Sequence, residues 1–198
     1  MKLKNILIPF LALAVACGIL FSVFMLTSPV RAKNIQSEHE KMMLLLLPGS
    51  ESFILEPYTG SDSSVQSVHK AENGYVVEVR HAGYNGDVVM MVGVNNEGKV
   101  TGLVVRDMNE TIGLGRNAMY DHEFLSQFLN VTGAVSIGQA ADALTGATEE
   151  ADSSDITAYA DAVTGATVTS KTIARCINSA IAVVTGADAT SAATSWGG

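Results

Sequence analysis

The sequence predicts an α+β fold: an antiparallel sheet with flanking helices, preceded by one N-terminal transmembrane helix. Three observations predict it: an uncharged apolar run near the start, several short stretches rich in β-branched residues, and an amphipathic segment near the end. The 198 residues suffice for one globular domain and an appendage. The net charge of −8 argues against a nucleic acid partner, because phosphate recognition requires clustered basic residues.

The apolar run extends from Ile6 to Leu26 without a charged residue. A helix of this length spans the hydrocarbon core of a bilayer, which is about 30 Å thick. Basic residues lie on both sides of the run, so charge alone does not determine its orientation. A short basic N-terminus usually stays in the cytoplasm, which would place residues 27–198 on the extracytoplasmic side of the cell membrane. Two alternatives are a signal peptide cleaved near Val30-Arg31-Ala32 and a lipoprotein cleaved before Cys17.

Composition divides the chain into four parts. A mixed charged and apolar stretch follows the anchor, and a tail rich in glycine, serine and alanine ends the chain. The parts are an anchor at 1–33 with its span at about 6–26, a helix and linker at 34–70, a folded domain at 71–185, and a flexible tail at 186–198.

Local patterns predict the elements in order. The first is a helix from Ser37 to Leu47, closed by Pro48-Gly49, and irregular structure follows at 51–67. Strands are expected where β-branched and aromatic residues concentrate, and two of them flank an Asn/Gly turn typical of a hairpin. Apolar residues at helical spacing predict two further helices. The expected strands are 75–80, 88–94 and 99–106, and the expected helices are 122–129 and 169 to about 184.

One stretch, Asp161 to Ser170, joins a turn of small residues to a helix N-terminus. Small side chains let a ligand approach the backbone closely. The orphan N–H groups of a first helical turn and the helix dipole favour a phosphate. Threonine and serine hydroxyls add a nucleophile beside this anion site. The same hydroxyls can instead cap the helix with no ligand present, and the residues alone leave both interpretations open.

This stretch resembles the flavinylation motif of the FMN-binding domain family: Asp, two variable residues, Ser or Thr, Gly, Ala, Thr or Ser, a variable residue, and a final Thr or Ser. A second block resembles the same family, from Gly83-Tyr84-Asn85-Gly86 to Glu110-Thr111-Ile112-Gly113-Leu114-Gly115. Ile112 stands where the family usually has proline, which should loosen the turn. With the anchor, the resemblance covers roughly residues 1–185.

The resemblance implies that FMN is joined to Thr169 through a phosphodiester bond, which an exported flavin transferase forms from FAD. It implies an attachment point, with no catalytic residue. No histidine pair has metal-ligand spacing, so no metal site is expected. The other residues implied in transferase recognition or flavin contact are Asp161, Thr164, Gly165, Ala166, Thr167, Glu110, Thr111, Gly113, Leu114 and Gly115.

Within the family, a short chain with one anchor is most similar to the G subunits of Rnf-type ion-translocating electron transport complexes. The C subunits of sodium-translocating NADH:quinone reductases are relatives. The resemblance implies a membrane-anchored flavoprotein subunit of a ferredoxin:NAD oxidoreductase-type complex, with the other membrane subunits as partners. The alternatives are a stand-alone exported FMN-binding electron-transfer protein and a non-redox binding module whose threonines cap a helix.

Residues Asp142–Glu150 partly repeat Asp161–Thr169, with Glu150 in the place of Thr169. A carboxylate cannot form the same phosphothreonyl ester, so we expect one flavin, on Thr169, and interpret the first copy as degenerate. Cys176 falls on the apolar face of the last predicted helix and is expected in the core. The histidines are expected to be exposed and structural, although His122 with Glu123 could line a flavin pocket.

Overall fold

The computed structural model describes residues 4–113, 115–138 and 156–186. Leu114, the partial repeat at 142–150 and nearly all of the predicted tail therefore lie outside the described residues. The chain divides into two compact units, Met1–Met42 and Met43–Gly198. The first unit holds most of one helix, and the second holds all the strands and the remaining helices.

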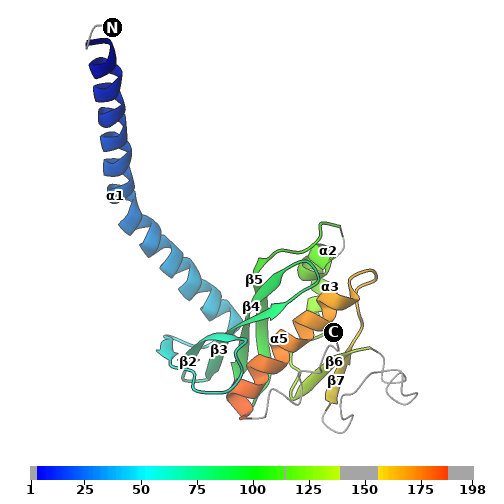
Figure 1. Ribbon diagram of the computed structural model, residues 1–198. Helices are drawn as coiled ribbons and strands as arrows, with labels where there is room; N and C mark the ends of the chain where they lie inside the picture. The colour runs from blue at the N-terminus through cyan, green and yellow to red at the C-terminus, as the bar shows by residue number, and fades with distance from the viewer. Residues whose placement is uncertain (1–3, 114, 139–155, 187–198) are drawn as a thin grey trace. The chain divides into compact units, whose positions relative to one another are not determined.

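Helix α1 spans Lys4–Leu46 (Figure 1). The two helical segments predicted at 6–26 and 37–47 are therefore parts of one helix, which ends just before Pro48 as expected. Its stretch Leu13–Leu46 is long and apolar enough to cross a membrane, and none of its most apolar window is buried. The core helix of a soluble protein would bury that window. A signal sequence, in contrast, would also be long, apolar and exposed.

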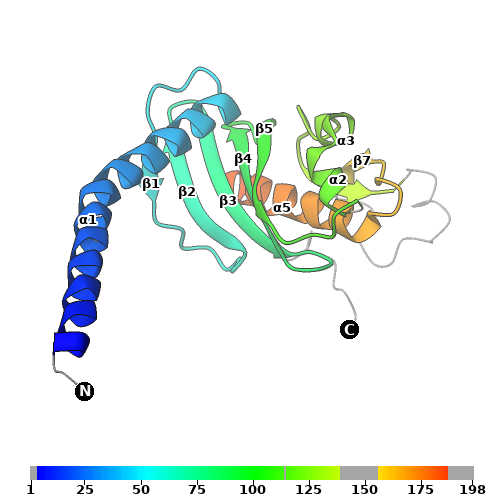
Figure 2. The same cartoon turned by 90° about the horizontal axis from the view of Figure 1, so that it is seen from above.

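The second unit is built on a five-stranded antiparallel sheet in which each strand pairs with its neighbours in the chain (Figure 2). The strands predicted at 75–80, 88–94 and 99–106 are confirmed as β3 to β5. The turn between β4 and β5 contains Gly98, at φ +79°. The strands are β1 (Ile54–Glu56), β2 (Val65–Ala71), β3 (Gly74–Ala82), β4 (Asp87–Asn95) and β5 (Val100–Met108).

The expectation of irregular structure at 51–67 is wrong for β1 and for the start of β2. All three residues of β1 are exposed, so they carry no alternation of buried and exposed positions that a pattern could reveal. Pairing with β2, from Ile54 opposite Lys70 to Glu56 opposite Val68, holds them in the sheet.

Among the described residues after the sheet there are three helices: α2 (Gly115–Tyr120), α3 (His122–Ser126) and α5 (Thr167–Thr185). Helix α5 packs against β3 and β4. Its predicted apolar face is confirmed, since Ile173, Cys176 and Ile177 are fully buried. The predicted start at Thr169 is two residues late. The predicted helix at 122–129 is confirmed for its first part, where the Asp121 carboxylate caps α3.

A second, two-stranded sheet pairs β6 (Ala134–Ile137) with β7 (Ile156–Ala160) in parallel. It was not predicted. The Asn178 amide ties β6 to α5, because it accepts from Val135 N at 2.8 Å and donates to Val135 O at 2.9 Å. With the antiparallel main sheet and its helices, this arrangement confirms the α+β class.

The hydrophobic core lies on both faces of the main sheet. On one face, α5, Met119 of α2 and Phe124 of α3 pack over residues such as Val77 and Met90. On the other face, the last turn of α1 packs Met43, Leu46 and Leu47 against Val76 and Met91. The first face carries the helices that build the candidate site.

Candidate functional site

The first turn of α5 has no side-chain cap. Its N-cap residue is Ala166, and no side chain bonds the first-turn N–H groups. The capping role that Thr164, Thr167 and Thr169 could have played is therefore not found. Gly165, at φ +79°, makes the preceding turn. An uncapped helix N-terminus leaves its backbone donors available to an anionic ligand.

Side-chain hydrogen bonds hold the turn before α5 in shape. The Ser170 hydroxyl accepts from Val163 N at 3.2 Å and donates to Ala166 O at 3.0 Å. The backbone N–H of Asp161 donates to Gln127 Oε1 at 2.9 Å, which links this turn to the end of α3. Within the motif, Ala166 and Thr169 are buried, whereas Asp161, Thr164, Gly165 and Thr167 are exposed.

Thr169 lies directly beneath Gly115, the first residue of α2. Thr169 is only 1% exposed. A Cβ added to Gly115 would lie 2.5 Å from Thr169 Oγ1 and 2.8 Å from Glu110 Oε2. The two sequence blocks that resemble the flavinylation family therefore meet at this point, although more than fifty residues of chain separate Glu110 from Thr169.

Glu110 is buried between the two blocks. Its Oε1 accepts from the backbone N–H of Tyr84 at 2.7 Å. Gly83 leaves room for this carboxyl group, because a Cβ there would collide with Oε1. The Thr172 hydroxyl of α5 donates to Ala82 O at 3.1 Å, so the turn at Gly83 is fixed against the same end of α5 that carries Thr169.

The segment between Glu110 and α2 is mostly exposed. Thr111, Ile112 and Gly113 all face solvent, and Gly113 has φ +89° with nothing close to its Cα substituent position. The Thr111 carbonyl accepts from Arg116 N at 3.1 Å, which closes the turn into α2. Of this block, Glu110 and Gly115 lie beside Thr169, whereas Thr111 and Gly113 are exposed.

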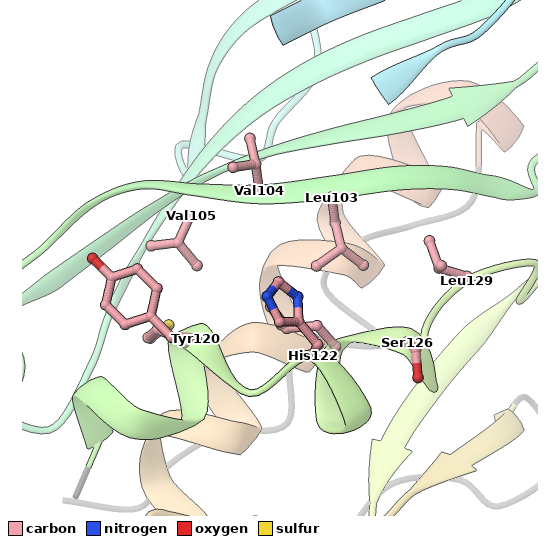
Figure 3. Close-up of a pocket in the computed structure, with 9 residues that line it drawn as sticks. Leu103, Val104, Val105, Tyr120, His122, Ser126 and Leu129 are labelled. Carbon is pink, nitrogen blue, oxygen red and sulfur yellow. The ribbon is translucent and has the colours of Figure 1, made fainter. Parts of the chain in front are cut away.

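An open pocket of about 450 Å³ lies between β5 and helices α2 and α3. Figure 3 shows the ring of His122 projecting toward Leu103 of β5, with Tyr120 beside Val105. Helix α2 joins the pocket to the buried threonine, because it begins at Gly115 and ends at Tyr120. The sequence suggested His122 as a residue that could line a flavin pocket, and none of the other lining residues was predicted as a site residue. The lining residues are Leu103, Val104, Val105, Met119, Tyr120, His122, Leu125, Ser126 and Leu129, and Glu123 is not among them.

Comparison with known proteins identifies the family. Residues 83–182 match the FMN-binding domain. The chain belongs to the FMN-binding domain family. The matched range begins at the Gly83 turn and ends within α5, so it includes Glu110, Gly115 and Thr169.

Two curated members are similar over most of their length. One is the G subunit of the proton-translocating ferredoxin:NAD(+) oxidoreductase complex of Clostridium ljungdahlii, 31% identical over 84% of this chain and 83% of the relative. The other is the G subunit of the ion-translocating oxidoreductase complex of Methanosarcina acetivorans, 26% identical over 74% of this chain and 86% of the relative. A crystal structure of the C subunit of the Na(+)-translocating NADH-quinone reductase from Parabacteroides distasonis matches with a TM-score of 0.46 at 16% identity, over 69% of this chain and 76% of that one.

A second polar cluster in this FMN-binding domain lies near the middle of α5. His81 Nε2 lies 3.1 Å from Ser179 Oγ, which accepts from the Ser64 hydroxyl at 3.2 Å. Burial lowers the pKa of His81. Burial also raises the pKa of the neighbouring Cys176 thiol to about 12, so this cysteine is an inert core residue, as expected.

Three of the four histidines, His39, His69 and His81, are half-buried, so the expectation that all are exposed is wrong for them. Within residues 4–113, 115–138 and 156–186, no group of three or more His, Cys, Asp or Glu residues could hold a metal ion.

Sequence reasoning missed several residues that position the site: Tyr84, Gln127, Ser170 and Thr172. Each acts through hydrogen bonds to a residue distant in the chain or to a turn. Tyr84 contributes only its backbone N–H, which no side-chain pattern can reveal. Ser170 was visible as the last hydroxyl of the motif, but its role in the turn depends on where Val163 folds back.

Proposed function

We propose that this protein is the membrane-anchored flavoprotein subunit of an ion-translocating electron transport complex of the ferredoxin:NAD oxidoreductase type, with FMN bound covalently to Thr169. The observation that carries the proposal is the position of Thr169: its hydroxyl lies in the uncapped first turn of α5, against Glu110 and Gly115 of the second motif block. The names of the two curated relatives support the assignment to a complex.

The residues present fit FMN. Backbone N–H groups at the start of α5 suit a phosphate, and the lack of acidic residues in that turn removes a source of repulsion. Bound FMN would supply the redox chemistry, taking up and releasing electrons one at a time. The chain itself would hold the phosphate at α5, fix the hydroxyl beside Gly115, and keep the Gly83 turn in place through Glu110.

We propose that the isoalloxazine ring of FMN binds in the pocket lined by Leu103, Tyr120 and His122. A six-residue helix such as α2 is about 9 Å long, which is comparable to the reach of a ribityl chain. The volume of about 450 Å³ lies in the range of small-molecule sites. Its mixture of apolar side chains with two aromatic rings suits a flat, amphipathic ligand.

The proposed arrangement in the cell follows from α1. This helix would remain uncleaved as a single span and hold the domain on the extracytoplasmic side, where an exported flavin transferase would modify it. Covalent attachment suits that location, because a lost flavin could not readily be replaced there.

The test of attachment is a denaturing gel viewed under ultraviolet light, after co-expression with a flavin transferase. We expect wild-type protein to fluoresce and Thr169→Ala to be dark. Thr185→Ala, which removes an exposed hydroxyl at the other end of α5, outside the motif, is the matched control and should fluoresce. Mass spectrometry of the labelled peptide then locates the flavin. Fluorescence in Thr169→Ala, or flavin on Thr148 of the partial repeat, contradicts the assignment.

The alternative function is a stand-alone exported electron-transfer flavoprotein. Mild-detergent purification of the tagged chain from its own membranes distinguishes the two. A subunit of a translocating complex should co-purify with other membrane redox proteins in fixed ratio. A flavin-loaded chain that elutes alone from native membranes favours the alternative.

A further inference from the structure

Glu110 has one carboxyl oxygen that is paired and one that is not. The residue is 7% exposed, and Oε1 accepts from Tyr84 N. Within the described part of the chain, Oε2 is buried with no hydrogen-bond partner. Burying a polar atom without a partner is unfavourable, so native proteins rarely do it without a functional reason.

The unpaired oxygen lies close to the proposed attachment threonine, with no hydrogen bond between the two side chains in this structure. Glu110 Oε2 and Thr169 Oγ1 lie within 2.8 Å and 2.5 Å of a single point, the Cβ position of Gly115. The hydrogen bond from Tyr84 fixes Oε1, which leaves Oε2 turned into the space that the hydroxyl shares. No side chain separates the two atoms there, because residue 115 is glycine.

We propose that Glu110 accepts the proton of the Thr169 hydroxyl when FMN is attached, so that the acceptor chain supplies the base for its own modification. The inference rests on the proposed attachment of FMN at Thr169. A threonine hydroxyl is a weak nucleophile and requires an adjacent base to become reactive. An ionised carboxylate is an acceptor without protons of its own, so it can take up that proton directly.

Atoms and electrons balance in this transfer. Thr169 Oγ1 forms a bond to the flavin-side phosphorus of FAD, and the bond from that phosphorus to the AMP oxygen breaks. AMP leaves with the bonding electron pair, while the hydroxyl proton moves to Glu110 Oε2. The resulting neutral carboxyl group can donate a hydrogen bond to the new phosphodiester, whereas a carboxylate would repel it.

The test is the initial rate of flavinylation of the full-length chain in detergent, with FAD and a purified flavin transferase, read from flavin fluorescence on denaturing gels. We expect Glu110→Gln, which keeps the shape and the acceptor for Tyr84 N, to be slower by about 100-fold or more. Glu123→Gln, which removes one exposed carboxylate from α3, is the matched control and should keep the wild-type rate.

The dependence of the rate on the concentration of the acceptor chain separates a base from a merely structural residue. Glu110→Gln should lower the maximal rate and leave the half-saturating concentration of the chain unchanged. A wild-type rate in Glu110→Gln, or a loss confined to the half-saturating concentration, overturns the inference.

Thermal unfolding checks that Glu110→Gln is folded, and Glu110→Asp decides the matter if it is not. The aspartate variant shortens the side chain and withdraws the carboxylate from the hydroxyl, so its maximal rate should fall at an unchanged half-saturating concentration. A folded Glu110→Asp with the wild-type rate overturns the inference. A wild-type chain that gains no flavin on Thr169 overturns the proposed function, and the inference with it.

Discussion

The Nε2 atom of His81 lies 3.1 Å from the hydroxyl oxygen of Ser179, and this contact ties strand β3 to the middle of helix α5. The charged groups that face His81 are Asp62, which raises its pKa, and Arg175, which lowers it. Burial outweighs the attraction of Asp62, so the pKa of His81 lies below its ordinary value. The folded protein therefore disfavours the protonated imidazole.

This shift predicts a loss of stability in mild acid. As pH falls through about 6.5, the ordinary pKa of histidine, the unfolded chain binds a proton that folded His81 does not, and stability decreases until the folded pKa is passed. His81→Gln should lack this contribution to the loss of stability in acid. The check is the midpoint of thermal unfolding at pH 7.5 and pH 5.5. The other three histidines are common to both proteins, so an equal drop in wild type and variant contradicts the prediction.

Gly115→Ala should prevent flavin attachment. The added methyl group would lie 2.5 Å from Thr169 Oγ1, a distance at which atoms must shift. It would also fill the space between that oxygen and Glu110. We expect a non-fluorescent band on a denaturing gel after co-expression with the transferase.

Gly186→Ala, at the end of α5 and outside both motif blocks, is the matched control for Gly115→Ala. Its methyl group meets nothing within 4 Å, but the backbone has φ +70°, so the change costs about 1–2 kcal/mol of folding stability through strain. This variant should be less stable yet still fluorescent. Equal fluorescence of the two variants would contradict the prediction that flavin attachment requires free space beside Thr169.

Removal of residues 1–33 should release the protein from membranes without loss of the folded domain. The apolar side chains of α1 are exposed, as with Phe10 at 71% and Leu26 at 74%, and such a surface requires a lipid or protein cover. Carbonate extraction of membranes checks the prediction. Intact mass distinguishes an anchor from a signal peptide: a mature chain that begins near residue 33 contradicts the uncleaved span.

Filling the pocket between β5 and α3 should displace the flavin ring without affecting its attachment. Ser126→Phe adds a ring among the lining residues, and Glu123→Phe adds the same ring on α3 outside them. In Ser126→Phe, the native visible absorption spectrum should become that of free FMN, while the denatured gel still fluoresces. An unchanged native spectrum would place the ring elsewhere.

Much of the main sheet could be predicted because its signals are local. Strands β3, β4 and β5 are successive, and each pairs with the next through a short turn, so composition and Gly98 suffice to locate them. The parallel pair β6 and β7 depends on contact across a long connection, and its strands are only four and five residues long. Short elements held by distant partners leave little trace in a single sequence.

In the candidate site, too, the local sequence signals could be predicted and the contacts between distant segments could not. Its proposed attachment residue, Thr169, and its second block, Glu110 to Gly115, were visible as a resemblance. That the two blocks touch at Gly115 could not be predicted, because it depends on how α5 lies against β3 and on the bond from Thr172 to Ala82. The unpaired oxygen of Glu110 is likewise a property of the packed structure.

The near-complete burial of Thr169 bears on the lifetime of the cofactor. If Thr169 carries FMN, its burial limits the access of water and hydrolytic enzymes to the ester linkage. A subunit with a damaged flavin would be renewed by synthesis of a new chain, so turnover of the cofactor would follow turnover of the polypeptide.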